Sequence, residues 1–362
     1  MALGDLRKEL RLGGAIRGPG LGYGIGVAEL VSLTEICTAA ERLRGVAVRT
    51  PLIPFRPPAP RGRRSALLIK PESLQPTGAF KLRGAYNAIS ARLARAGAAP
   101  AGVVAHSSGN HGFAVAYAAA LLGVPAVIVV PDTAPRVKTD LIRGAGAELI
   151  TVAATLDART RASRDLARAR GYAEIPPFDD ADVIAGQGTI GLEIAEDLAD
   201  GPAPAAVLVP VGGGGMVSGI AIAVKSLLPG TRVIGVEPAL AADARESLRT
   251  GRRVAWAASD TAATLADALR VEQVGVLTFP HLQAFVDDIV TVSEDEIRES
   301  VRWVAHVGRL VAEPGGAVAV AAALFRDPAE LGLTPGTTQG PMVAVLSGGN
   351  IDPTLLGEIL RT

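Results

Sequence analysis

From about residue 101 onward, the chain alternates between short apolar runs and longer segments with helical spacing. Strands that are apolar on both faces are typical of parallel sheets, because helices cover both sides of such sheets. The pattern predicts a parallel α/β unit. Its strands are expected at 102–107, 125–130 and 147–152, and its helices at 110–122, 135–144 and 157–170.

A second unit of the same class follows after a loop around residues 178–182. Ser293 begins a Ser-Glu-Asp-Glu capping box, which indicates the start of another helix. The predicted fold class is therefore α/β, with two open, mostly parallel twisted sheets flanked by helices. The further helices are expected at 188–198, 216–228 and 317–325, and the further strands at 66–70, 207–211, 233–237, 289–292 and 342–346.

Composition narrows the classes of partner. Lysine plus arginine equals aspartate plus glutamate at 36 each, and aromatic residues make up 4%, which disfavours nucleic-acid binding and favours a small-molecule partner. The longest uncharged runs, 114–131 and 203–224, are broken by glycine and proline, so no membrane span is expected. The single cysteine, Cys37, is consistent with a cytoplasmic protein. The glycine-rich residues 1–26 are expected to be a poorly ordered extension.

Four motifs carry candidate chemistry, and three of them have polar side chains. Lys81 follows a Pro-Thr-Gly turn and opens a helix, which is a suitable position for a nucleophile. The motif SSGNH at 107–111 comes at the end of one predicted strand, and SGGN at 347–350 comes at the end of another. Ligands bind at the carboxyl ends of strands in open parallel sheets, so these polar residues are predicted to line a site.

The stretch GGGGM at 212–216 lies between a buried strand and a helix. Bare backbone amides at a helix start favour phosphate binding. The glycine spacing does not match the dinucleotide fingerprint, and no Gly-Lys-Ser/Thr follows to make a P-loop. Glu237, at the end of the next strand, keeps a nucleotide-dependent oxidoreductase open as a distant alternative. The four histidines lack zinc-ligand spacing.

Together, PTGAFKLRGA at 76–85, SSGNH, GGGG and SGGN resemble the serine/threonine dehydratase and serine racemase family of pyridoxal-phosphate enzymes. The resemblance runs from about Val31 to the end and includes IAGQGTIGLEI, TLADAL, DDIVTVSEDEI and EPGGA. It implies a tryptophan-synthase-β-like fold (fold type II) with the cofactor in a cleft between domains, and a homodimer. The implied domains are a large cofactor-binding domain of 27–100 and 182–362, a small mobile domain of 101–181, and no C-terminal regulatory domain.

The resemblance also implies roles for individual residues. Lys81 would form the Schiff base with pyridoxal phosphate and remove the substrate α-proton, and Ser108 would exchange a proton from the opposite face. The carboxylates of Glu237 and Asp243 and the Ala241 carbonyl would bind Mg²⁺ or Ca²⁺ as hard oxygen donors. The cofactor would contact Phe80 at its ring, Asn110 at its ring hydroxyl, Gly212, Gly213, Gly214, Gly215 and Met216 at its phosphate, and Ser347 at its pyridine nitrogen. The substrate carboxylate would contact Ser107, Ser108, Asn110 and His111, and the metal ligands would be Glu237, Ala241 and Asp243.

The leading hypothesis from sequence is a lyase that deaminates L-serine, L-threonine or a related β-hydroxy amino acid to a 2-keto acid and ammonia. A serine racemase of the same family is the nearest alternative, and a cofactor-binding protein without turnover is a third. The chain departs from the usual family residues at Phe113, Ala79, Pro176 and Ala268. If Phe113 and Ala268 face the substrate, a modified β-hydroxy amino acid is expected.

Overall fold

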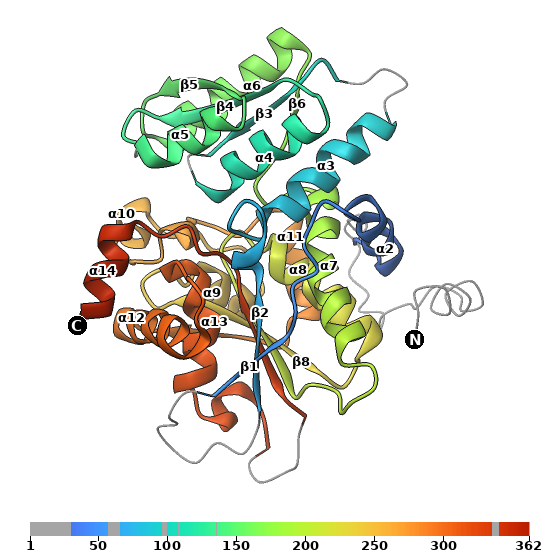
Figure 1. Cartoon of the computed structure of the whole chain (residues 1–362), viewed down its shortest axis with the longest axis vertical. Coiled ribbons are helices and arrows are strands. Elements are labelled where there is room, and N and C mark those ends of the chain that lie inside the picture. Colours follow the sequence, from blue (N-terminus) through green and yellow to red (C-terminus); the bar gives the residue numbers. More distant parts are fainter. Residues whose placement is uncertain are drawn as a thin grey trace.

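The computed structural model describes residues 30–56, 66–95, 100–107, 109–134, 136–334 and 340–361. The chain forms two β-sheets with helices packed around them (Figure 1). The strand orders are β5-β4-β3-β6 and β1-β2-β10-β7-β8-β9. Among the strand pairs of the described residues, β1 with β2 is antiparallel and the others are parallel. The predicted fold class is confirmed.

The four-stranded sheet forms the upper lobe in Figure 1. Its central strands are almost fully buried, because α4 covers one face and α6 the other. Its strands are β3 (Val103–His106), β4 (Ala126–Pro131), β5 (Glu148–Val152) and β6 (Ala173–Glu174). The helices of this lobe are α4 (Asn110–Leu121), α5 (Arg136–Gly144) and α6 (Leu156–Arg170).

The six-stranded sheet separates two apolar cores. Val207 and Val209 of β7 face the core that contains α8, whereas Leu208 faces the core that contains α13. Successive side chains of a strand point to opposite faces, so one apolar run serves both cores. The strands are β1 (Ile53–Phe55), β2 (Leu67–Pro71), β7 (Ala206–Pro210), β8 (Arg232–Pro238), β9 (Asp288–Val292) and β10 (Met342–Leu346). The flanking helices are α7 (Ala181–Asp197), α8 (Gly215–Leu227), α12 (Glu294–Trp303) and α13 (Pro314–Phe325).

The remaining elements connect these layers. The α-helices are α2 (Leu33–Arg42), α3 (Lys81–Arg95), α9 (Asp243–Thr250), α10 (Ala258–Thr261), α11 (Thr278–Phe285) and α14 (Pro353–Arg361). The short helical turns are η1 (Glu72–Leu74), η2 (Asp267–Leu269), the π-turn η3 (Val304–Gly308) and η4 (Pro328–Leu331).

The start of α7 differs from the sequence prediction. The helix was predicted to begin at Gly188 but begins at Ala181, where the Asp180 side chain caps it by accepting from the Val183 amide. Its glycines serve helix packing rather than a loop. A Cβ on Gly186 would lie 2.6 Å from the Arg83 carbonyl oxygen of α3, so a side chain there would push the two helices apart.

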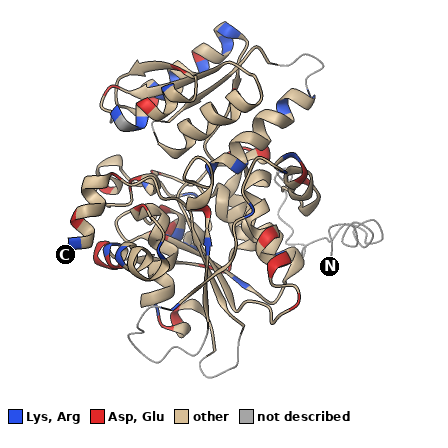
Figure 2. Cartoon of the chain, in the orientation of Figure 1, with Lys and Arg blue, Asp and Glu red and all other residues tan. Residues whose placement is uncertain are grey.

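The strands of the four-stranded sheet fall between residues 103 and 174. The division into a large domain of 27–100 and 182–362 and a small domain of 101–181 stays a prediction, and residues 1–26 lie outside the described residues. Acidic and basic residues occur on elements of both lobes (Figure 2). Within the part of the chain that the structure describes, every helix is too short or too polar to cross a bilayer.

Candidate active site

Lys81 is the first residue of α3, as the sequence predicted. The turn that precedes it lies against the SGGN loop after β10, where the Phe80 amide donates to the Ser347 carbonyl oxygen at 3.0 Å. Gly78 has φ +70°, and a Cβ there would lie 2.2 Å from the Asn350 side-chain oxygen. The lysine is therefore held at the carboxyl end of the six-stranded sheet.

The Lys81 amine lies in a partly enclosed position. Its Nζ donates to the Pro177 carbonyl oxygen at 2.7 Å and lies 5.0 Å from the centroid of the Phe80 ring. Burial lowers the pKa of Lys81 to about 8, although the charge of Glu313 opposes this shift. A lysine with a lowered pKa has a larger neutral fraction near pH 7 to 8, which suits a nucleophile or a base.

The tetraglycine loop, Gly212–Gly215, lies close to the segment Pro177–Phe178, whose first residue accepts the Lys81 hydrogen bond. The Phe178 ring, next to Pro177 in sequence, would be 2.3 Å from a Cβ on Gly213, and a Cβ on Gly215 would be 3.0 Å from Phe178. Gly214 has φ +92° and is the N-cap of α8. Lys81 and the tetraglycine loop therefore flank the segment Pro177–Phe178, and sequence analysis did not identify Phe178 as a site residue.

These features fit a cofactor that carries a phosphate and an aldehyde. The first turn of α8 has backbone amides that no Gly214 side chain can cap, and such helix starts bind phosphate. Met216 lies in this turn and is buried. A partly buried lysine amine is the group that condenses with an aldehyde.

A hydrogen-bond network connects three of the predicted motifs. The Asn110 Nδ2 donates to Glu313 Oε1 at 2.6 Å, and the Asn110 Oδ1 accepts from Asn350 Nδ2 at 2.7 Å. Asn350 Nδ2 also donates to the Thr77 carbonyl oxygen at 2.9 Å, in the turn before Lys81. The network therefore brings SSGNH, SGGN and the lysine turn together.

Glu313 is a residue of this site that sequence analysis did not assign. The signal was present, because Glu313 begins the EPGGA segment that supported the family resemblance. The residue is 5% exposed. Burial raises the pKa of Glu313 to about 7, and the charge of Asp267 adds to this shift, while the Asn110 hydrogen bond and the charges of Lys138 and Lys81 oppose it.

The SSGNH residues occupy different environments. The Ser107 hydroxyl accepts from the Gly109 amide at 3.2 Å, and Ser108 lies outside the described residues. His111 is buried, and its Nε2 donates to the Ile175 carbonyl oxygen at 2.8 Å. Burial, together with the charge of Lys81, lowers the pKa of His111 to about 3, so its ring is neutral. The His111 ring therefore connects α4 to the four-stranded sheet, and substrate binding by this residue stays a prediction.

The predicted metal ligands lie together at the ends of β8 and α9. Glu237 accepts from the Ala244 and Arg245 amides at 3.0 and 2.8 Å and so caps α9. Asp243 is 1% exposed, and its Oδ2 is a buried oxygen without a hydrogen-bond partner. Burial raises the pKa of Asp243 to about 7, and burial with the Asp243 charge raises that of Glu237.

Buried carboxyls with raised pKa values and an unpartnered oxygen fit a cation. The described residues contain no group of three or more His, Cys, Asp or Glu side chains that could hold a metal ion. A cation at this place would therefore need backbone or water oxygens as well, and the buried Ala241 is the predicted source of a carbonyl.

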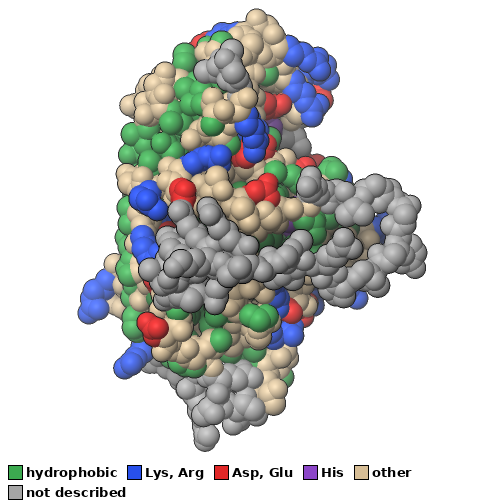
Figure 3. Space-filling model, turned by 90° about the vertical axis from the view of Figure 1, so that its right-hand side faces the viewer, with side chains coloured by type: hydrophobic (Ala, Val, Ile, Leu, Met, Phe, Trp, Pro, Cys, Tyr) green, Lys and Arg blue, Asp and Glu red, His purple; other side chains and the backbone are tan. Residues whose placement is uncertain are grey.

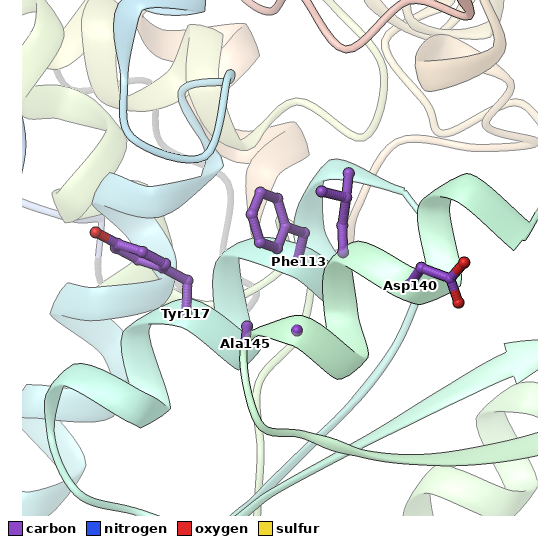
Figure 4. Close-up of a pocket in the computed structure, with 6 residues that line it drawn as sticks. Phe113, Tyr117, Asp140 and Ala145 are labelled. Carbon is purple, nitrogen blue, oxygen red and sulfur yellow. The ribbon is translucent and has the colours of Figure 1, made fainter.

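Phe113 and Ala268, two of the residues that depart from the family pattern, lie in different parts of the structure. Phe113 and Tyr117 of α4 make an edge-to-face contact with centroids 6.3 Å apart and line a pocket of about 630 Å³ beside α5 (Figure 4). Leu141 of α5 lines the same pocket and is exposed, and apolar side chains gather along one edge of this lobe (Figure 3). Ala268 instead lies near Gly315, two residues after Glu313, with 3.2 Å between its Cβ and a Cβ built on Gly315.

Comparison with known proteins gives consistent matches. A family model described as pyridoxal-phosphate dependent enzyme matches residues 43–348. The chain is 40% identical over 335 residues to an L-threonine ammonia-lyase of Thermotoga maritima, which covers 92% of this chain and 79% of that protein. It is also 40% identical over 335 residues to an L-threo-3-hydroxyaspartate ammonia-lyase of Pseudomonas, and the match covers 92% of this chain and 99% of that protein. The structure of maize serine racemase superimposes with a TM-score of 0.82 at 31% identity. The superposition covers 92% of this chain and 98% of the maize chain.

Proposed function

This chain belongs to the family of pyridoxal-phosphate-dependent enzymes, as the motif resemblance predicted, and we propose that it is an ammonia-lyase acting on a β-hydroxy amino acid. In the proposed reaction the substrate loses its α-proton and its β-hydroxyl, and hydrolysis of the product releases ammonia and a 2-keto acid. The observation that carries the proposal is that the Lys81 amine and the tetraglycine loop contact neighbouring residues, Pro177 and Phe178, of one segment.

The site residues would hold the cofactor as follows. Lys81 would bond to its aldehyde carbon, and Phe80 would lie against its ring. The amides of Gly212–Gly215 and Met216 would bind its phosphate, Asn110 its ring hydroxyl, and Ser347 its pyridine nitrogen. When bound, the cofactor supplies an electron-accepting ring that makes the α-proton of an amino acid removable.

The residues of the chain then provide proton transfer and orientation. The neutral Lys81 amine accepts the α-proton at its Nζ, which the pKa of about 8 favours near neutral pH. The amides of the loop 107–111 bind the substrate carboxylate. As the family resemblance implies, Ser108 would exchange a proton at the face opposite Lys81, and a racemase activity would depend on this residue.

The substrate is tested with a panel of amino acids. We expect L-threonine, L-serine or L-threo-3-hydroxyaspartate to give a 2-keto acid and ammonia in equal amounts, because relatives at 40% identity are ammonia-lyases for threonine and hydroxyaspartate. Keto acid is measured as its hydrazone, and the serine that remains is analysed for chirality. D-serine without keto acid would favour the alternative, a serine racemase.

The cation site gives a second prediction. We propose that Glu237, Asp243 and the Ala241 carbonyl bind Mg²⁺ or Ca²⁺, because Asp243 has a buried oxygen without a partner. A ligand present at 100 times its Kd stabilises a fold by about 2.7 kcal/mol. We therefore expect chelator to lower the thermal midpoint and added Mg²⁺ or Ca²⁺ to restore it. The response should be lost in Asp243→Asn and kept in Glu246→Gln, a matched change on the same helix; an equal response in all three proteins contradicts the site.

We also propose a homodimer in the cytoplasm. The family resemblance supports the dimer, and a single cysteine in the sequence is consistent with a reducing compartment. Light scattering coupled to gel filtration measures the molar mass in solution and so tests the homodimer directly.

A further inference from the structure

We propose that Glu313 is a positioning residue, whose carboxylate fixes the orientation of the Asn110 side-chain amide so that an N–H of that amide faces the ring hydroxyl of the cofactor. The inference rests on the proposed function, because it takes Asn110 as the residue that contacts this hydroxyl. It goes further by assigning the orientation of Asn110 to a residue in a distant part of the chain.

The hydrogen bonds determine which way the amide faces. In its ionised form, which is the main form above the raised pKa of about 7, the Glu313 carboxylate only accepts hydrogen bonds and so selects the NH₂ side of Asn110, at 2.6 Å. Asn350 donates to the oxygen of the same amide at 2.7 Å. The amide is therefore held from both ends. One N–H of its NH₂ group points to Glu313, and the second N–H is the one that we assign to the cofactor.

The position of Glu313 is unusual for a residue at a helix start. Glu313 is the N-cap of α13, but its side chain makes no capping hydrogen bond to that helix. Asp, Asn, Ser and Thr are the residues preferred for capping, because their short side chains reach the first amides. The Glu313 carboxylate instead extends to Asn110 of α4, 203 positions earlier in the chain.

The surroundings of Glu313 are shaped to admit its carboxylate. A Cβ on Gly348 would lie 2.3 Å from Glu313 Oε1, so only glycine at this position leaves room for it. The Glu313 amide donates to the Gly348 carbonyl oxygen at 3.1 Å, which fixes the backbone as well. The SGGN loop therefore holds both Glu313 and, through Asn350, the amide that Glu313 orients.

Charge at this position acts on the lysine too. The charged groups that face Glu313 are Lys81 of α3, Lys138 of α5 and Asp267 of η2. The Glu313 charge raises the pKa of Lys81 against the effect of burial. The neighbouring His111 ring is neutral, because burial and the Lys81 charge lower its pKa to about 3. Removing the Glu313 charge should therefore move the deprotonation of Lys81 to lower pH.

The two effects of Glu313 are separated by two substitutions. Glu313→Gln keeps the size of the side chain but removes the charge and accepts either orientation of the Asn110 amide. Glu313→Asp keeps the charge but shortens the reach to Asn110. We expect both variants to bind pyridoxal phosphate about tenfold more weakly, which corresponds to about 1.4 kcal/mol. Only Glu313→Gln should lower the pH midpoint for the reaction of apoprotein with the cofactor.

The decisive measurement is a double-mutant cycle on the Kd for pyridoxal phosphate, obtained by equilibrium dialysis of apoprotein. If Glu313 acts through Asn110, Glu313→Gln in an Asn110→Ala background causes no further loss of affinity. Equal losses in both backgrounds overturn the inference and leave the proposed function intact. If the native chain does not bind pyridoxal phosphate, both the inference about Glu313 and the proposed function are overturned. The thermal midpoint of each apoprotein, measured alongside, identifies loss of fold, and Glu313→Asp provides the same cycle if Glu313→Gln is unfolded.

Discussion

The Lys81→Ala protein is expected to release no measurable keto acid and to bind pyridoxal phosphate without a covalent bond. The change removes the amine that condenses with the aldehyde and that accepts the α-proton. Loss of the proton acceptor alone costs about 10²–10⁴-fold in rate, and loss of covalent attachment adds to it. The fold should persist, because Lys81 is only partly buried and its described hydrogen bond is to one backbone carbonyl.

Borohydride reduction followed by peptide mass mapping tests the attachment directly. In the native protein the reduced cofactor should be found on Lys81 and not on Lys8, Lys70, Lys138 or Lys225. Lys225→Ala is the control, since Lys225 pairs with Asp287 at the end of α8. Cofactor on another lysine, or keto-acid release by Lys81→Ala, would remove Lys81 from the catalytic role.

The second large effect is expected at Arg83, two residues after Lys81 in α3. Its guanidinium is 1% exposed and bonds to both oxygens of Glu72, at 2.7 and 2.9 Å. It also donates to Glu193 of α7 at 2.6 Å, and Lys70 of β2 donates to the same carboxylate at 2.6 Å. This ionic cluster connects α3, the helix that begins at Lys81, to β2 of the six-stranded sheet and to α7.

Arg83→Met should lower the free energy of unfolding by roughly 3–5 kcal/mol, because the change leaves two buried carboxylates without their main partner. Burial raises the pKa of Glu193, but the charges of Arg83 and Lys70 outweigh burial and keep that pKa below its ordinary value. The native contribution of Glu193 is therefore present above the pKa of the unfolded chain and is lost as pH falls through the lower, folded pKa. Arg83→Met should lack this acid-sensitive part of its stability.

Urea unfolding at several pH values measures both effects. Arg49→Ala is the matched control, since Arg49 pairs with Glu196 and Asp197 of the same helix but is half exposed. Exposed ion pairs contribute about 0–1 kcal/mol, so the control should unfold nearly like the native protein. Equal destabilisation of the two variants would show that burial of the cluster is not what makes Arg83 important.

The order of elements followed from the sequence because it depends on local spacing. The strand at 342–346 and the helix starting at Lys81 occur where the pattern predicted them. Ser293 and Glu296 form the predicted capping box. Each of these features involves residues within a few positions of one another, so a single stretch contains the information. The antiparallel β1 and the two-residue β6 are too short for such a pattern and were missed.

The motifs identified the candidate site residues but not the reasons for their identity. Gly213 was interpreted as part of a phosphate cradle, and the structure adds that Phe178 leaves no room for a side chain there. His111 was assigned to the substrate loop, and the structure adds that its ring bonds to the carbonyl of Ile175, directly after β6. In both cases the deciding neighbour comes from a different element.

The sequence by itself determined most of the longer elements, the fold class and the presence of a lysine, a tetraglycine loop and two polar strand ends. Only the tertiary structure decided that Glu313 contacts Asn110, because these residues are 203 positions apart and nothing in either local pattern specifies the other. Local patterns fix which backbone conformation a segment adopts, whereas packing of the sheets and helices fixes which side chains meet. The orientation of the candidate site therefore depends on contacts that form only when the two sheets and α13 are assembled.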